Sequence, residues 1–506
     1  MPFEKRKLDN ITRSVLVEGR IDSKKIKSNN AKKEQTKIEK KNIDKKIHKS
    51  LQYSITEGVF NTASSSITES YITPFALMLR ASNLDIGLLF SIRNFANTIA
   101  QIPGAKLTEF FDRKFIWFFS QIISRIIIWI PIILLPFIPL KNPITLLILL
   151  FAIAGFFSAL RSPAWSSLMG DLVPMKIRGR YFGWRNTING IAGVVATLAA
   201  GFLLSYYGFP LIFIIAIILA AISIPLFLKI YEPPFKKIYH YKHRFEFNPR
   251  YWPNTLRVNR SLAIFTVYIF FMYLAVEIAS PFYAVYMLRE LKIDYIWFGI
   301  LTVIGAVARI LSFKYWGKLN DKFGSRKILI VCGFFGIFTP FGWMLVFDIF
   351  TIAILKVFDG FIWSGFDMVV FNYLLDITPA EKRPQYVANF NFFIGIGVIL
   401  GSVIGGILAE SWSNTTFLWL HGLQIIFLLS FLLRLACLLL LPKLGEVVIR
   451  HSDIPIRYVF WYAIAVEPAR NIMHAISYTF RYPYEIEKKF KKEIDKLKFK
   501  IKAMEN

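Results

Sequence analysis

Residues 209–228 read FPLIFIIAIILAAISIPLFL and contain no charged side chain. A helix rises about 1.5 Å per residue, so this stretch would extend about 30 Å, the thickness of the hydrocarbon core of a bilayer. Residues 127–140, IIWIPIILLPFIPL, are also uncharged, and similar runs recur along the chain. A soluble protein of this length would place charged residues along its surface helices throughout. The pattern therefore predicts an all-α membrane protein that crosses the bilayer many times.

Hydropathy read in windows of about 19 residues predicts twelve transmembrane helices. An even number of spans places both ends of the chain on the same side of the membrane. The predicted spans lie near residues 53–79, 84–106, 115–140, 144–169, 184–206, 209–230, 261–288, 294–316, 328–347, 349–375, 386–409 and 415–441.

Basic residues gather on one side of the predicted membrane. The net charge is +28, of which residues 1–50, 231–260 and 443–506 carry +9, +5 and +5. Loops on the same side as these segments hold 12 Lys and Arg, against 4 on the other side. The positive-inside rule places the richer side, with both termini, in the cytosol of a cell (plasma) membrane protein. Dispersed lysines outside any recognisable domain predict contact with anionic membrane lipids and not with nucleic acid.

The same pass predicts the domain organisation. Residues 458–480 are a possible thirteenth span, but Glu467 and Arg470 near its middle favour an interfacial helix. The predicted segments are a disordered basic cytosolic tail (1–50), an N-terminal six-helix bundle (51–230), a cytosolic central loop (231–260), a C-terminal six-helix bundle (261–441) and a cytosolic C-terminal tail with the interfacial helix (442–506).

The two halves of the chain repeat one another. Residues 171–201 align with residues 376–406 at an offset of 205, so that Asp171 meets Asp376 and Gly201 meets Gly406. Pro174 and Arg178 have counterparts at the same offset. Glycines let neighbouring helices pack closely, and two six-span halves in parallel orientation are typical of a transporter.

A loop signature lies between predicted spans 8 and 9. Residues 317–327 read GKLNDKFGSRK, and the first half has a degraded counterpart, GAKLTEFFDRK, at residues 104–114. These motifs resemble the major facilitator superfamily (MFS), in particular its prokaryotic members, over about residues 51–441. The matching positions, which the resemblance implies form a cytosolic gating motif, are Gly317, Asp321, Gly324, Arg326 and Lys327 in the second half and Glu109, Arg113 and Lys114 in the first.

The resemblance implies two pseudo-symmetric six-helix bundles, a monomer, and a secondary active transporter that moves a small solute by alternating access. In this family spans 1, 4, 7 and 10 line a central cavity. Ionisable residues inside spans are functional candidates because their exposure to lipid is costly. The resulting candidates for a substrate and proton cavity are Glu69, Arg161, Glu277, Asp359, Trp363 and Asp367.

Proton coupling is the sharper hypothesis for these carboxylates. A carboxylate in a partly dry cavity can bind and release a proton, and Glu69, Glu277 and Asp367 are the candidates. The alternative is a static network of salt bridges. Asp359 and Lys356, three residues apart, would simply neutralise each other in that case.

Other functional classes have less support from the sequence. No GxxxxGK[ST] or HExxH motif occurs, and Cys332 and Cys437 lie in apolar spans, so we expect no cofactor, no metal and no enzymatic activity. A transporter-like sensor or receptor that binds a ligand without net flux stays open. An integral membrane enzyme would need a catalytic cluster, which the sequence does not suggest.

Overall fold

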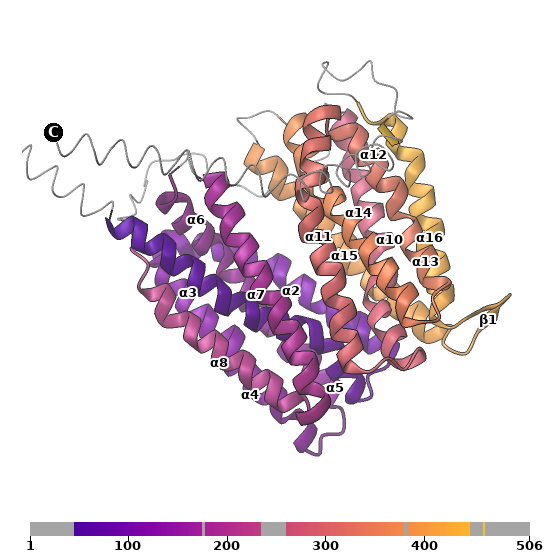
Figure 1. Cartoon of the computed structure of the whole chain (residues 1–506), viewed down its shortest axis with the longest axis horizontal. Helices are drawn as coiled ribbons and strands as arrows, with labels where there is room; N and C mark the ends of the chain where they lie inside the picture. Colours follow the sequence, from indigo (N-terminus) through magenta and orange to yellow (C-terminus); the bar gives the residue numbers. More distant parts are fainter. Residues whose placement is uncertain (1–44, 175–177, 234–259, 379–382, 446–458, 461–506) are drawn as a thin grey trace, which may run out of the picture. The chain divides into compact units, whose positions relative to one another are not determined.

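The computed structural model is helical in the residues it describes, apart from one short hairpin (Figure 1). It divides into two compact units, which are described separately below. Unit 1 comprises Met1–Lys242 with Asp294–Ile300, and unit 2 comprises His243–Ile293 with Leu301–Asn506. The described residues are 45–174, 178–233, 260–378, 383–445 and 459–460.

Most of the predicted tails and of the central loop lie outside the described residues. The first helix spans residues 45–78 and so includes residues 45–50, which the sequence analysis places in the tail. Of the predicted interfacial helix, only residues 459–460 are described, and they are helical.

Unit 1 consists of helices in the order of the predicted spans. The helix of residues 45–78 is followed by α2 (Asn83–Phe110), α3 (Arg113–Ile122), the π-helix η1 (Ile123–Ile127), α4 (Trp129–Leu134), the 3-10 helix η2 (Leu135–Phe137), α5 (Pro143–Leu160), α6 (Ser162–Leu172), α7 (Arg178–Tyr207) and α8 (Phe209–Leu228).

Two spans of unit 1 are interrupted next to prolines. A proline has no N–H to donate to the carbonyl four residues earlier, and its ring crowds that turn. The π-helix η1 ends four residues before Pro131, and α5 gives way to α6 at Arg161, two residues before Pro163. At the second break the N–H of Arg161 bonds to the carbonyl of Ala159. The Arg161 side chain therefore lies at a discontinuity in its span.

Unit 2 carries the second set of helices and the hairpin. Its elements are α10 (Arg260–Val285), the π-helix η5 (Tyr286–Glu290), α11 (Tyr295–Phe323, apart from residues 295–300, which belong to unit 1), α12 (Ser325–Gly336), α13 (Phe338–Met344), α14 (Ile349–Ile377), α15 (Arg383–Ser411), the antiparallel strands β1 (Thr416–Phe417) and β2 (Leu420–His421), α16 (Leu423–Cys437) and the 3-10 helix η7 (Leu438–Lys443).

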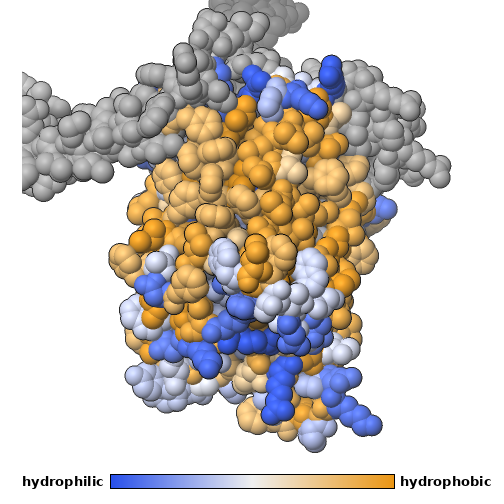
Figure 2. All heavy atoms as spheres, turned by 90° about the vertical axis from the view of Figure 1, so that its right-hand side faces the viewer, coloured by the Kyte–Doolittle hydropathy of each residue, from blue (hydrophilic) through white to orange (hydrophobic). Residues whose placement is uncertain are grey.

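Ten segments of the described chain are long and apolar enough to cross a membrane. They are Arg113–Phe137, Pro143–Leu172, Arg180–Tyr207, Phe209–Leu228, Arg260–Glu290, Tyr295–Phe323, Ser325–Met344, Ile349–Ile377, Phe390–Ser411 and Leu423–Lys443. The first two predicted spans coincide with the helix of residues 45–78 and with α2, which are long enough but more polar. Figure 2 shows the apolar side chains that cover much of one face, with hydrophilic ones at its upper edge and lower part.

The helices reproduce the internal repeat. α6 ends at Leu172 and α14 at Ile377, 205 residues apart, which is the offset found in the sequence. α7 ends at Tyr207 and α15 at Ser411, 204 residues apart. The two units are therefore copies of one helical plan, and the break at Arg161 distinguishes the first copy from the continuous α14.

Glycines set the closest helix contact in unit 2. Gly397, Gly401 and Gly405 form one stripe on α15, and a Cβ at any of them would collide with the backbone of α10. Close approach of this kind is how helices associate in lipid, where no hydrophobic driving force acts between them.

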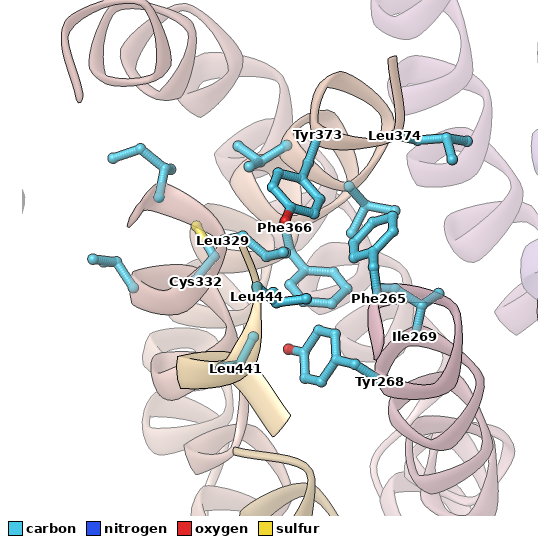
Figure 3. Packing of buried hydrophobic residues seen from close by; sticks show 14 of the residues in the cluster. Phe265, Tyr268, Ile269, Leu329, Cys332, Phe366, Tyr373, Leu374, Leu441 and Leu444 are labelled. Carbon is cyan, nitrogen blue, oxygen red and sulfur yellow. The ribbon is translucent and has the colours of Figure 1, made fainter. Parts of the chain in front are cut away.

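The core of unit 2 is aromatic and aliphatic (Figure 3). Phe265 stacks on Phe390 with ring centroids 5.1 Å apart, and Tyr268 is fully buried between α10 and α12. A Cβ at Gly333 would lie 2.6 Å from the Tyr268 hydroxyl, so glycine makes room for that ring. This packing fixes α10, which carries two of the polar side chains described below.

Candidate functional site

The main polar cluster of unit 1 is centred on Glu69, in the helix of residues 45–78. Its Oε1 accepts a hydrogen bond from Arg93 Nη2 of α2 at 2.8 Å, and Arg125 Nη2 of η1 lies 3.7 Å away. Arg125 also donates to Thr68 Oγ1 at 2.9 Å. The Arg125 side chain is 7% exposed and that of Glu69 is 47% exposed, so a buried guanidinium meets a carboxylate that is open on one side. Glu69 therefore joins three helical segments through ion pairs.

Arg161 carries a buried guanidinium with spare hydrogen-bonding capacity. The residue is 9% exposed, and its Nη1 has no hydrogen-bond partner in the part of the chain that the structure describes. Its Nη2 is 3.5 Å from Ser158 Oγ, and its Cζ lies 5.8 Å from the centre of the Trp117 ring. No described carboxylate comes within 4.0 Å of it. A buried charge left unpaired in this way is costly, so Arg161 can accept a negatively charged partner.

A second carboxylate in unit 1 is paired through one of its two oxygens, while its Oε1 has no hydrogen-bond partner among the described residues. Glu57 is 1% exposed, and its Oε2 lies 3.4 Å from Arg185 Nη2. Arg185 also donates from Nε to the Ser54 carbonyl at 3.2 Å, and its Cζ lies 4.7 Å from the centre of the Trp165 ring. These contacts tie the first helix to α7 and α6, which is a structural role.

In unit 2, Asp367 of α14 lies between two partners. Its Oδ1 accepts a hydrogen bond from the Tyr273 hydroxyl of α10 at 3.0 Å, and its Oδ2 forms an ion pair with Arg309 of α11. The side chains of Arg309 and Asp367 are 46% and 31% exposed. Asp367 thus resembles Glu69 in being a carboxylate with a guanidinium partner and partial exposure.

Glu277 of α10 has a different environment. Ser402 Oγ of α15 donates to its Oε2 at 3.4 Å, and no Lys, Arg or His nitrogen of the described residues lies within 4.0 Å of it. The Cβ that Gly401 lacks would stand 2.9 Å from Glu277 Cβ, so α15 is pressed against this position. Pro281, four residues later in α10, has no N–H to donate to the Glu277 carbonyl. Glu277 is therefore a carboxylate without a counter-charge among the described residues.

Asp359 and Lys356 do not form a close ion pair. Asp359 accepts a hydrogen bond from Thr339 Oγ1 of α13 at 3.1 Å. Lys356 Nζ lies 5.2 Å from the centre of the Trp343 ring, a cation–π contact, and it is more than 4.0 Å from the Asp359 carboxylate. The two residues are electrostatically close without sharing a hydrogen bond.

Trp363 contacts side chains of its own helix α14 and of α16. Its ring packs edge-on against Phe366 with centroids 5.1 Å apart, and Arg434 Cζ of α16 lies 5.7 Å from it. Positions four apart rotate by about 40° around a helix, so Asp359, Trp363 and Asp367 face successive neighbours.

The predicted gating residues of unit 1 hold its own helix ends together. Arg113 is 1% exposed, with Nη1 at 2.5 Å from Asp171 Oδ2 and Nε at 3.1 Å from Glu232 Oε1. Lys114 Nζ donates to the Leu228 carbonyl at 2.9 Å. These bonds link the start of α3 to the ends of α6 and α8.

In unit 2 the equivalent junction lies between α11 and α12. Gly324 caps α12 with φ of 81°, a backbone conformation that favours glycine. Ser325 Oγ donates to Asp376 Oδ2 at 2.7 Å, and Arg326 Nη2 donates to the Pro442 carbonyl at 3.2 Å. The motif therefore again connects the start of one helix to the ends of two others.

The remaining motif residues lie at the same helix ends. Gly317 and exposed Asp321 lie in the last turns of α11, and buried Lys327 lies in the first turn of α12. A Cβ at Gly317 would meet nothing within 4 Å. Glu109 is in the last turn of α2, and its side chain lies outside the described part of the structure.

The sequence analysis missed two partners of the candidate site, Tyr273 and Ser402. Tyr273, which binds Asp367, is four residues before Glu277 on α10, and that spacing could have placed it on the same helical face. Ser402 carried no comparable signal. Arg309 is visible in the sequence as a charge inside a span, but its pairing with Asp367 depends on which helices become neighbours.

Ten apolar spans, two units repeated at an offset of 205 residues and ion pairs inside the spans define a multi-pass helical membrane protein. The family model of the Major Facilitator Superfamily matches residues 55–267 and 265–454. The chain belongs to this family, as the loop motifs predicted, and it has the two-bundle helical fold of the family.

Several proteins are similar to parts of this chain. The uncharacterized MFS-type transporter YqjV of Bacillus subtilis (strain 168) is 29% identical over 175 residues, 33% of this chain and 40% of YqjV. The uncharacterized MFS-type transporter MJ1560 of Methanocaldococcus jannaschii is 24% identical over 352 residues, 66% of this chain and 85% of MJ1560. The quinolone resistance protein NorA of Staphylococcus aureus (strain Mu50) is 27% identical over 179 residues, 35% of this chain and 45% of NorA. The chain thus spans less than half the length of YqjV and NorA.

Solved structures support the same fold. A mutant form of the nucleoside transporter NupG superposes with a TM-score of 0.64 at 13% identity, over 78% of this chain and 100% of the NupG chain. A bacterial homologue of the human lysosomal transporter Spinster, in an inward-facing and occupied conformation, has a TM-score of 0.60 at 15% identity, over 80% of this chain and 98% of the homologue. Identities this low establish a shared fold and nothing about the solute.

Proposed function

We propose that this chain is a secondary active transporter that moves a small solute across the cell membrane by alternating access, coupled to protons. Membership of the Major Facilitator Superfamily and its relatives among MFS-type transporters support this proposal. In this proposal the protein works as a monomer, both termini are cytosolic, and the basic segments contact anionic lipid.

The coupling site in this proposal is Glu277. Glu277 lies within a membrane span, and no cationic nitrogen of the described residues comes within 4.0 Å of its carboxylate. This observation carries the proposal. An ionised carboxylate is costly there, while the protonated form can keep the contact with Ser402. A carboxylate that alternates between its protonated and ionised forms can take up a proton on one side of the membrane and release it on the other. Glu69 and Asp367 already have guanidinium partners, so in our proposal they maintain the shape of the polar region.

The proposed anchor for the solute is Arg161. Away from the helix ends, the spans of unit 1 hold four guanidinium groups, those of Arg93, Arg125, Arg161 and Arg185, against the two carboxylates of Glu57 and Glu69. A negative group on the solute would balance part of this surplus by pairing with the unused Nη1 of Arg161. A carboxylate or phosphate on the solute fits this arrangement better than a cationic drug does.

The Arg113 and Ser325 junctions are proposed as the cytosolic gating elements. Each connects the start of one helix to the ends of others, so its contacts can differ between two conformations and bias the equilibrium between them. Asp359 and Trp363 complete the proposed polar route in unit 2.

Transport is tested with the full chain reconstituted in liposomes. Labelled nucleosides, quinolones and small metabolic carboxylates are offered one class at a time under an imposed pH gradient, and thermal shift of the purified protein measures binding in parallel. We expect a bound anionic solute to accumulate inside the liposomes. A solute that stabilises the protein but never moves would overturn transport in favour of a ligand-binding sensor.

A further inference from the structure

The hairpin between α15 and α16 carries an apolar tip. Phe417 pairs with Leu420, and Leu418 and Trp419 form the two-residue turn between them. Phe417 and Trp419 are each 52% exposed and Leu418 is 81% exposed, whereas Leu420 at the base is 2% exposed. Three large apolar side chains in a row thus project from the protein with no cover in the part of the chain that the structure describes.

The base of this hairpin is held in place by buried hydrogen bonds. Gly422 N–H donates to the Thr415 carbonyl at 3.1 Å, and His421 N–H donates to Gln424 Oε1 at 3.1 Å. Gln424 in turn donates to the Tyr286 hydroxyl at 3.0 Å and to the Met344 carbonyl at 3.3 Å. The tip is therefore presented at a defined place at the ends of η5 and α13.

Leu418 is an unfavourable residue for its backbone conformation. Its φ is 55°, a region that glycine and asparagine adopt readily and that is strained for leucine. A glycine would make this turn without strain, but it would have no side chain to present. The sequence keeps a leucine here at a conformational cost, which points to a partner that covers its side chain.

The position of the tip identifies that partner. The hairpin lies between the membrane spans Phe390–Ser411 and Leu423–Lys443, so it starts where the hydrocarbon core ends. Two residues of strand reach about 7 Å, and the polar interface on each side of the core is about 5–7 Å thick. Figure 1 shows the hairpin extending sideways from the ends of the unit 2 helices, without continuing their direction.

We propose that residues 416–421 are an interfacial anchor, which inserts Phe417, Leu418 and Trp419 among the lipid headgroups on the side of the membrane opposite to the α11–α12 junction. Aromatic side chains are enriched at this depth because their rings are apolar while the indole N–H can still bond to water or headgroups. The anchor fixes the depth of unit 2 in the bilayer through a contact outside the helical bundle. It is independent of the solute and of the proton.

The test places a fluorescent label at the tip. Cys332 and Cys437 are buried, so a polarity-sensitive maleimide dye reacts mainly with the introduced thiol of Leu418→Cys. The exposed loop residue Asn142, changed to Cys, is the matched control in a polar loop. Both variants are reconstituted in vesicles of equal parts phosphatidylethanolamine and phosphatidylglycerol.

We expect the dye at position 418 to emit at shorter wavelength and to be quenched by lipids with a nitroxide close to the headgroup, while aqueous iodide quenches the dye at position 142. Strong iodide quenching at position 418 with no quenching by lipid would overturn the proposal. So would a blue-shifted dye at position 418 that neither quencher reaches, because that result indicates a protein partner. The chain has eleven other tryptophans, so the label-free test compares total tryptophan fluorescence, and brominated lipid should quench a smaller share of it in Trp419→Phe than in wild type.

Discussion

Ser402 Oγ of α15 donates to Glu277 Oε2 of α10 across 3.4 Å, at a point where Gly401 brings the two helices into close contact. By contrast, Glu69 pairs with Arg93 at 2.8 Å and Asp367 pairs with Arg309. Removing the charge of Glu277 therefore leaves no described cation unpaired, whereas removing the charge of Glu69 does. The proposal of a coupling role for Glu277 and a structural role for Glu69 rests on this contrast.

Stability measurements detect that difference directly. We expect Glu277→Gln to leave the melting temperature of the purified protein unchanged or higher, because a charge without a counter-charge is removed from a membrane span. Glu69→Gln should lower the free energy of unfolding by about 1 kcal/mol, a value at the low end for ion pairs because the Glu69 side chain is 47% exposed. Thermal unfolding followed by fluorescence measures both. A loss in Glu277→Gln as large as in Glu69→Gln would contradict the assignment.

Close packing of α10 and α15 gives a second prediction. Gly401→Leu should destabilise unit 2 strongly, by about 2–4 kcal/mol, because its side chain would collide with the Leu274 carbonyl and with Glu277. The control is Gly183→Ala in α7, where an added Cβ meets nothing within 4 Å and alanine favours the helix. Expression and melting temperature of both variants check this. Equal stability of the two variants would show that the glycine stripe does not set the helix distance.

The two helix-end junctions should differ in strength. Arg113 bridges Asp171 and Glu232, while in the second unit Ser325 makes a single hydrogen bond to Asp376. Arg113→Ala removes the ion-pair partner of two carboxylates, and we expect the free energy of unfolding to fall by about 2–3 kcal/mol. This is less than for a fully buried ion pair because the Asp171 side chain is 48% exposed.

Ser325→Ala is the matched change in the second unit, and it should lower the free energy of unfolding by about 1 kcal/mol. Denaturation of both variants in the same detergent gives the comparison. A larger loss for Ser325→Ala would mean that Arg113 is not the main connection.

The proposed solute anchor predicts a graded series. Arg161→Gln should weaken binding of an anionic solute by at least tenfold, because it removes the guanidinium group whose Nη1 has no partner among the described residues. Arg161→Lys keeps the charge but not the planar fork, so it should fall between the wild type and Arg161→Gln. Thermal shift titrations with the solute found by transport give the affinities. Unchanged affinity in Arg161→Gln would place the solute elsewhere.

The fold followed from the sequence because lipid imposes a simple rule. Apolar runs of about 20 residues must be helices, and the run at 209–228 became α8 at Phe209–Leu228. The repeat was visible for the same reason, since Asp171 and Asp376 mark equivalent helix ends. The breaks at Arg161 and before Pro131 were not predicted, because hydropathy does not register a missing backbone donor.

The candidate site was predicted only as a set of charges. Their positions in spans were visible, so Glu69, Glu277 and Asp367 could be named, but their partners could not. Arg93 and Arg309 lie on other helices, and sequence spacing says nothing about which helices become neighbours. The difference between a paired Asp367 and an unpaired Glu277 therefore required the structure.

The most direct test of the account measures proton movement in liposomes that contain a pH-sensitive dye, with wild type and Glu277→Gln compared for the same solute. Addition of the solute should drive protons across the membrane with wild type. Glu277→Gln should still exchange labelled for unlabelled solute but move no protons. Proton movement equal to that of wild type in Glu277→Gln would contradict the proposed coupling at this residue.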